Sequence, residues 1–182
     1  MALKIAEGWI NLPEIGFVLK QMTSPTGNIL EVGAANGRLF SFLHHYKPKW
    51  KYTAIDPWEI EGQWLQVDWK KRYWDPGNAK KVITIDMFKS NCPYAETHQT
   101  YFENFDSTSL ADTYDIISMG LGSKTRSIDW KNDYNKAFSM LRPNGVIIGR
   151  DLTHNRESSR IKEALQDYEI LDTCGGSFMM KK

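Results

Sequence analysis

The segment that constrains this chain most is Ile29-Leu-Glu-Val-Gly-Ala-Ala-Asn-Gly37, an apolar run that ends in a short loop bounded by glycines. Residues 28–32 have the composition of a buried strand, and apolar residues recur at helical spacing after Gly37. Glycines let the backbone approach a ligand closely and adopt angles that a β-carbon forbids. A strand, a glycine loop and a helix in this order favour a ligand at the strand end. The competing interpretation is a tight strand-to-helix turn.

The rest of the chain alternates strand-like runs with helical patterns. Asn11-Leu-Pro-Glu14 predicts a helix start, with a polar cap, a proline in the first turn and an acid three residues on. We expect further helices over residues 79–91, 134–141 and 161–168, and further strands over residues 51–55, 98–102, 114–119 and 146–149. Residues 168–173 and 177–180 flank Cys174-Gly-Gly176, which predicts an antiparallel hairpin. The alternation predicts an α/β fold with a mostly parallel sheet covered on both faces.

Composition limits the classes of partner. The 182 residues fit one domain, and a formal net charge of +1 gives no general attraction to nucleic acid or to anionic membranes. Cys92 and Cys174 form neither a disulfide framework nor a metal cluster, which is compatible with a reducing cytoplasm. No stretch approaches the roughly 20 apolar residues of a membrane span, and residues 1–8 do not predict a signal peptide. We therefore expect a soluble, cytoplasmic protein.

A second position, Asp56, narrows the class of ligand. It ends the strand that follows the glycine loop, where a carboxylate can accept both hydroxyls of a ribose. The dinucleotide fingerprint is G-x-G-x-x-G, but Ala35 stands where its middle glycine would be. The remaining G-x-x-x-G pattern favours a ligand without phosphate, as S-adenosylmethionine is. The alternatives are that Asp56 only initiates a turn before Pro57 and that Glu31 is a buried acid paired with a base.

The loop, with Glu31 before it, resembles motif I of the class I S-adenosylmethionine-dependent methyltransferases, and Asp56 matches that family's acidic ribose-binding position. The resemblance runs from Asn28 to the terminal hairpin. It implies a Rossmann-like single domain over residues 1–182, with a central, mostly parallel seven-stranded sheet, helices on both faces and a C-terminal antiparallel hairpin. Residues 1–27 would form an N-terminal cover helix, and residues 57–80 an aromatic-rich insertion or lid.

The resemblance also implies cofactor contacts. Asn104 and Phe105 follow the third strand, where the family contacts adenine, and Met119 and Gly120 end the fourth strand beside the methionine moiety. Trp9 lies either in a segment that covers the cofactor or in a helix-packing anchor. The full set of expected cofactor-binding residues is Glu31, Gly33, Ala34, Ala35, Asn36, Gly37, Asp56, Pro57, Trp58, Asn104, Phe105, Met119 and Gly120.

Methyl transfer from a sulfonium requires the protein to hold nucleophile, methyl and sulfur in line and to exclude water. A base assists when the acceptor is a hydroxyl or an amine. Asp151 and His154 follow the fifth strand and are the candidate catalytic residues; the alternatives are a capping carboxylate and an exposed loop histidine. Metal-dependent relatives also have an acid at the end of strand four, but residues 117–122 contain none. One Asp is not a site for a hard cation, so we predict no metal.

The expected acceptor is a small molecule. The motif of amino-methylating DNA enzymes is absent after strand four, so we expect no nucleic acid partner. The stretch from Trp58 to Trp74, with Lys70-Lys-Arg72, would either stack on bases or form an amphipathic helix over the sheet edge, and the second interpretation is favoured. Two other hypotheses stay open: an enzyme that cleaves S-adenosylmethionine, and a non-catalytic fold relative with a binding or structural role. The oligomeric state is open as well.

Overall fold

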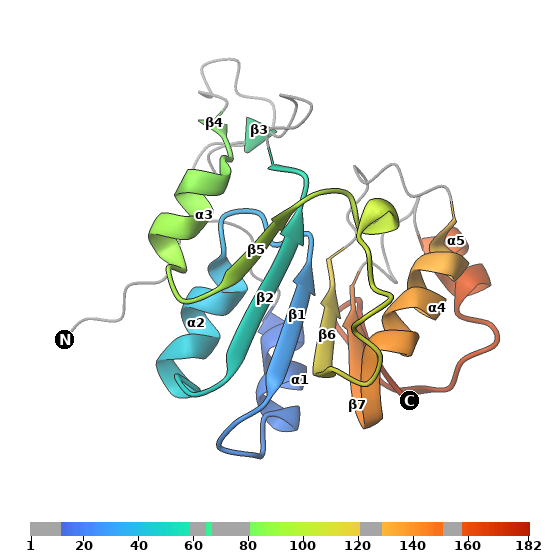
Figure 1. Ribbon diagram of the computed structural model, residues 1–182. Coiled ribbons are helices and arrows are strands. Elements are labelled where there is room, and N and C mark those ends of the chain that lie inside the picture. Colours follow the sequence, from blue (N-terminus) through green and yellow to red (C-terminus); the bar gives the residue numbers. More distant parts are fainter. Residues whose placement is uncertain (1–11, 59–64, 67–80, 121–128, 151–157) are drawn as a thin grey trace.

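The structure is a computed structural model that describes residues 12–58, 65–66, 81–120, 129–150 and 158–182. Figure 1 shows a central sheet with helices on both sides. The elements are, in chain order, α1 (Leu12–Gln21), β1 (Asn28–Val32), α2 (Arg38–Tyr46), β2 (Lys51–Asp56), β3 (Leu65–Gln66), β4 (Lys81–Val82), α3 (Ile85–Asn91), β5 (Glu96–Gln99), η2 (Phe102–Asn104), β6 (Tyr114–Met119), α4 (Trp130–Met140), β7 (Leu141–Gly149), α5 (Ser158–Ala164), β8 (Ile170–Cys174) and β9 (Ser177–Lys181).

The main sheet has seven strands in the order β5-β2-β1-β6-β7-β9-β8. The first five are parallel to one another, whereas β9 runs antiparallel to both β7 and β8. The chain moves outward from β1 through β2 to β5 and then returns to β6 on the other side of β1. The order therefore reverses between β1 and β6, and in such sheets ligands bind at the carboxyl ends of the strands that flank this point. The predicted fold class is confirmed.

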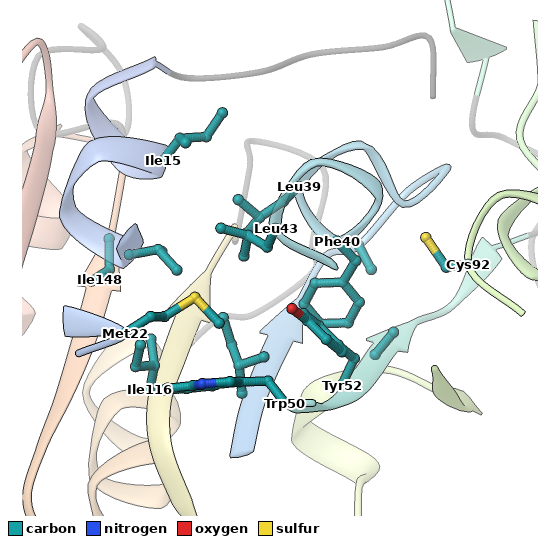
Figure 2. Packing of buried hydrophobic residues seen from close by; sticks show 14 of the residues in the cluster. Ile15, Met22, Leu39, Phe40, Leu43, Trp50, Tyr52, Cys92, Ile116 and Ile148 are labelled. Atoms are coloured by element: carbon teal, nitrogen blue, oxygen red, sulfur yellow. The ribbon is translucent and has the colours of Figure 1, made fainter. Parts of the chain in front are cut away.

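Strand residues alternate between two cores. Ile29 and Ile148 face the side covered by α1, α2 and α3, whereas Leu30 and Ile147 face the side covered by α4 and α5. Figure 2 shows the first of these cores, where residues of α1 and α2 meet the sheet. The central strands β1, β2, β6 and β7 are buried on both sides over most of their length, which is why they contain long apolar runs in the sequence.

Some predicted boundaries were wrong. The third strand ends at Gln99, the partner of Asp56 in the parallel register, and does not continue to Phe102. The third helix begins at Ile85 rather than at residue 79, because the Thr84 hydroxyl accepts a hydrogen bond from the Met87 amide at 3.2 Å and caps it there. Among the described residues, no helix is long and apolar enough to span a membrane. The predicted lid over residues 57–80 lies largely outside the described residues.

Candidate functional site

Every second residue of the loop after β1 has a left-handed backbone conformation. Gly33, Ala35 and Gly37 have positive φ angles of 80°, 49° and 81°. The Gly33 amide donates to the Ile55 carbonyl at 2.8 Å, and the Gly120 amide donates to the Val32 carbonyl at 2.8 Å. The loops that follow β1 and β6 are in direct contact, since a β-carbon at Gly33 would lie 2.4 Å from the Gly120 carbonyl oxygen. The backbone thus continues the sheet's hydrogen bonding into the crevice at the switch point.

Asp56 holds this loop in place. Its Oδ2 accepts the Ala35 amide at 2.9 Å, and its Oδ1 accepts the Trp58 amide at 2.7 Å. Ala35 adopts a left-handed conformation that costs an alanine roughly 1–2 kcal/mol, and the hydrogen bond to the carboxylate helps offset that cost. The ribose contact stays a prediction.

The carbonyls of the loop are held by residues from outside it. The Trp58 indole N–H donates to the Ala35 carbonyl at 2.6 Å, and its fully buried ring packs against Phe88 with the centroids 5.3 Å apart. The carbonyls of the next two loop residues, 36 and 37, accept from Asn91 Nδ2 at 2.9 Å and Cys92 Sγ at 3.3 Å. Sequence reasoning missed Asn91 and Cys92, because nothing local links the end of α3 to the loop. Side chains that follow β2 and end α3 therefore hold the loop carbonyls in place.

Four side chains that share one face of the sheet form a buried cluster, which we call the charged cluster: Glu14, Glu31, Ser118 and Arg150. The Ser118 hydroxyl donates to Glu14 Oε1 at 2.5 Å, Glu14 Oε2 lies 3.5 Å from Arg150 Nε, and Arg150 Nη2 lies 3.9 Å from Glu31 Oε1. The second oxygen of Glu31 is buried and has no hydrogen-bond partner among the described residues. Sequence reasoning read Glu14 only as a first-turn acid and assigned no role to Arg150.

Burial raises the pKa of Glu31 well above its usual range. The Arg150 guanidinium opposes this rise in pKa, whereas the Glu14 and Asp56 carboxylates increase it. A further cation beside Glu31 would lower this raised pKa and favour the charged carboxylate. The sequence left open that Glu31 pairs with a base. Arg150 is such a base, but it lies close to Glu14 as well as to Glu31.

The other predicted cofactor residues lie at or after the carboxyl ends of β2, β5 and β6. Met119 is buried at the end of β6, and Gly120 follows it half-buried. Pro57 is buried beside Asp56. Asn104 is exposed on η2, and the next residue, Phe105, packs its ring against His98 with the centroids 4.9 Å apart.

Three predicted positions cannot be placed. Trp9, Asp151 and His154 lie outside the described residues, so their roles stay predictions. Within the part of the chain that the structure describes, no group of three or more His, Cys, Asp or Glu side chains is arranged to hold a metal ion. The prediction of a metal-free reaction likewise stays a prediction.

Comparison with known proteins gives consistent matches. A family model described as a methyltransferase domain matches residues 13–180. A solved structure of a putative S-adenosyl-L-methionine-dependent methyltransferase from Methanococcus maripaludis is 12% identical, with a TM-score of 0.61 over 92% of this chain and 83% of that one. An O-methyltransferase from Thermotoga maritima is 12% identical, with a TM-score of 0.63 over 97% and 67%.

A precorrin-6y C5,15-methyltransferase from Geobacter metallireducens is 13% identical, with a TM-score of 0.59 over 99% of this chain and 92% of that one. At these identities, the likeness to solved structures concerns the fold. No curated protein sequence matches the chain significantly.

Proposed function

This chain belongs to the methyltransferase domain family, and from that premise we propose that it transfers a methyl group from S-adenosylmethionine to a small-molecule acceptor without a metal ion. The observation that carries the proposal is the loop after β1, which Asp56 and Trp58 fix at the topological switch point. A fixed backbone at this place suits a ligand whose methyl group must be held in one position.

The residues around the loop fit an S-adenosyl ligand. Gly33 and Ala35 are the partly exposed members of the loop, so a nucleoside can approach their backbone. Asp56 ends β2 beside the loop, where its carboxylate would accept the ribose hydroxyls. The unpartnered oxygen of Glu31 offers negative charge to a cationic ligand, and a buried polar atom without a partner is unusual in folded proteins. Phe105 and Asn104 would lie on the adenine side.

When bound, S-adenosylmethionine would supply an electrophilic methyl group, and its transfer to a nucleophile in line with the methyl–sulfur bond would release S-adenosylhomocysteine. The task of the chain is to hold both reactants and to keep water away. Asp56 and Trp58 hold the loop, and Pro57 between them is buried. Asp151 and His154 are the proposed bases for a hydroxyl or amine acceptor, because both come within five residues after the end of β7 in the sequence.

The choice of a small molecule as acceptor rests on charge. A formal net charge of +1 gives no general attraction to nucleic acid.

Cys92 and Cys174 are both free thiols, which supports a reducing cytoplasm as the location.

Native mass spectrometry of freshly purified protein, followed by calorimetry with S-adenosylhomocysteine, tests the proposal. We expect the cofactor or its demethylated product to co-purify and to bind. No binding of either at millimolar concentration would contradict the proposal and leave a non-catalytic relative. Methylthioadenosine or a lactone formed without any acceptor would indicate cleavage instead of transfer.

Replacing Asp56 by alanine is expected to weaken S-adenosylhomocysteine binding at least about tenfold, because two backbone amides of the loop region lose their acceptor. Asp115→Ala is the matched control. The Asp115 carboxylate also accepts a backbone amide, that of Asn28 at 2.7 Å, but at the opposite end of β1. Both variants should lose stability, and calorimetry should find weaker binding only in the first. Unchanged affinity of Asp56→Ala would contradict the role of Asp56.

Trp58→Phe keeps an aromatic ring but removes the N–H that donates to Ala35. We expect roughly a two- to tenfold loss of S-adenosylhomocysteine affinity and about 1 kcal/mol of lost stability. Trp50→Phe is the control, because the buried Trp50 indole donates to the Ser24 carbonyl at 3.1 Å, beyond the other end of the sheet. Its loss of stability should be similar, with unchanged binding. Equal binding losses in the two variants would mean that both act only through the fold.

A further inference from the structure

The charged cluster joins α1, β1, β6 and the residue after β7 at the carboxyl ends of the strands. Arg150 follows β7, Glu31 lies in β1, and Glu14 comes from α1, which packs over this face of the sheet. Glu14 and Ser118 are 104 residues apart in the chain. The side chains of Glu14 and Glu31 are each 4% exposed, whereas the Arg150 side chain is 20% exposed. Arg150 is thus the most exposed of the three charged side chains.

The missing side chain of Gly120 leaves the space that the Arg150 guanidinium occupies. A β-carbon at Gly120 would lie 2.0 Å from Arg150 Nη2, so any other residue there would displace the guanidinium. Arg150 consequently lies against the backbone that follows β6, next to the contact between Gly33 and Gly120. A guanidinium and a carboxyl group, Arg150 and Glu31, meet at the crevice with 3.9 Å between their nearest atoms.

The amino-acid end of an S-adenosyl ligand carries an α-ammonium and a carboxylate next to each other. A site that offers one acidic and one basic group side by side is complementary to that pair. The ammonium would bring a cation to Glu31, whose partner Arg150 also pairs with Glu14, and the carboxylate would bring an acceptor to Arg150.

We propose that Arg150 determines specificity for the amino-acid end of the cofactor: it binds the carboxylate, Glu14 orients it, and Glu31 receives the ammonium. This inference rests on the proposed function. Among the described residues, the charged groups that influence the pKa of Glu31 are Arg150, which follows β7, Glu14 from α1 and Asp56 from β2. Glu14 acts as a positioning residue, because it reaches Arg150 Nε from α1 and is itself held by the Ser118 hydroxyl.

Calorimetry with three probes tests the inference: S-adenosylhomocysteine, its analogue that lacks only the carboxylate, and methylthioadenosine. We expect the wild-type protein to bind S-adenosylhomocysteine at least about tenfold more tightly than the decarboxylated analogue, as one charged hydrogen bond would give. Arg150→Gln should lower the affinity for S-adenosylhomocysteine about tenfold and leave that for the decarboxylated analogue within about twofold. Arg150→Lys, which keeps the charge, should recover part of the loss.

Arg142→Gln is the matched control. Arg142 lies on the same strand, in an ion pair with Asp115 at 3.0 Å, but at the opposite end of the sheet. It should bind all three probes as the wild type does. A purely structural role for Arg150 would lower the affinity for both S-adenosylhomocysteine and its decarboxylated analogue equally, and that result would overturn the inference.

Two further outcomes keep the test decisive. If Arg150→Gln does not fold, equal affinity of the wild-type protein for S-adenosylhomocysteine and the decarboxylated analogue would by itself overturn the inference. If none of the three probes binds the wild-type protein, the proposed function fails and this inference fails with it. Binding of all three probes without discrimination by carboxylate leaves the proposed function standing and removes only the inference.

Discussion

Replacing Gly33 by alanine is expected to abolish measurable S-adenosylhomocysteine binding and to lower the free energy of unfolding by roughly 2 to 5 kcal/mol. Two effects add. The φ angle of 80° disfavours any residue with a β-carbon, and that β-carbon would lie 2.4 Å from the Gly120 carbonyl oxygen. A backbone atom cannot rotate away as a side chain can, so the two loops must separate. Chemical denaturation and calorimetry measure the two losses.

Gly16→Ala is the matched control for this prediction. Gly16 lies exposed in α1, and a β-carbon there would have no atom within 4 Å. Alanine inside a helix is more stable than glycine by roughly 0.5–1 kcal/mol, so this variant should gain stability and bind normally. Replacing glycine by alanine should therefore lower the free energy of unfolding at position 33 and raise it at position 16. A Gly33→Ala protein with wild-type stability would contradict the close contact between the two loops.

Glu31→Gln is expected to stabilise the ligand-free protein at neutral pH while weakening S-adenosylhomocysteine binding by about tenfold or more. The pKa of Glu31 is raised well above 4.5 in the folded protein, first by burial. The folded chain therefore keeps a proton that the unfolded chain releases, and stability falls as the pH rises from 4.5 through the raised pKa. Glutamine does not titrate, so the Glu31→Gln variant does not lose this stability as the pH rises.

Thermal unfolding measured from pH 4.5 upward should show a growing advantage of Glu31→Gln over the wild type, which levels off above the raised pKa. Glu103→Gln, on the exposed face of η2, is the control and should show no such trend. A difference between Glu31→Gln and the wild type that stays constant with pH would contradict the proton held by Glu31. The ligand-binding loss has a separate origin, since glutamine offers no charge to an ammonium.

The fold was predictable because its signals are local. The apolar run from residue 28 to 32, the helical spacing after Gly37 and the glycines at 175 and 176 each report on neighbouring residues in the chain. Where a boundary was wrong, a contact outside the segment decided it. Strand β5 stops at Gln99 because its partner β2 stops at Asp56.

The charged cluster was not predictable, because its residues lie far apart in the chain. Nothing near Glu14 indicates that it will meet Ser118 or Arg150. Its one sequence signal is an acid next to Ile15 on the buried side of α1, where an unpaired charge would be costly. Ala35 shows that residue type does not always report backbone conformation. The sequence has alanine where a dinucleotide-binding loop has its middle glycine, yet Ala35 adopts the left-handed conformation that favours glycine.

The position of β9 has a consequence for how the chain folds during synthesis. This strand is made last among the seven, yet it lies between β7 and β8 rather than at the edge. On the ribosome, β8 emerges before the strand it must pair with, and the open edge of β7 has no partner until residues 177–181 have followed. Until then, the nascent domain exposes an unpaired strand edge of the kind that chaperones protect.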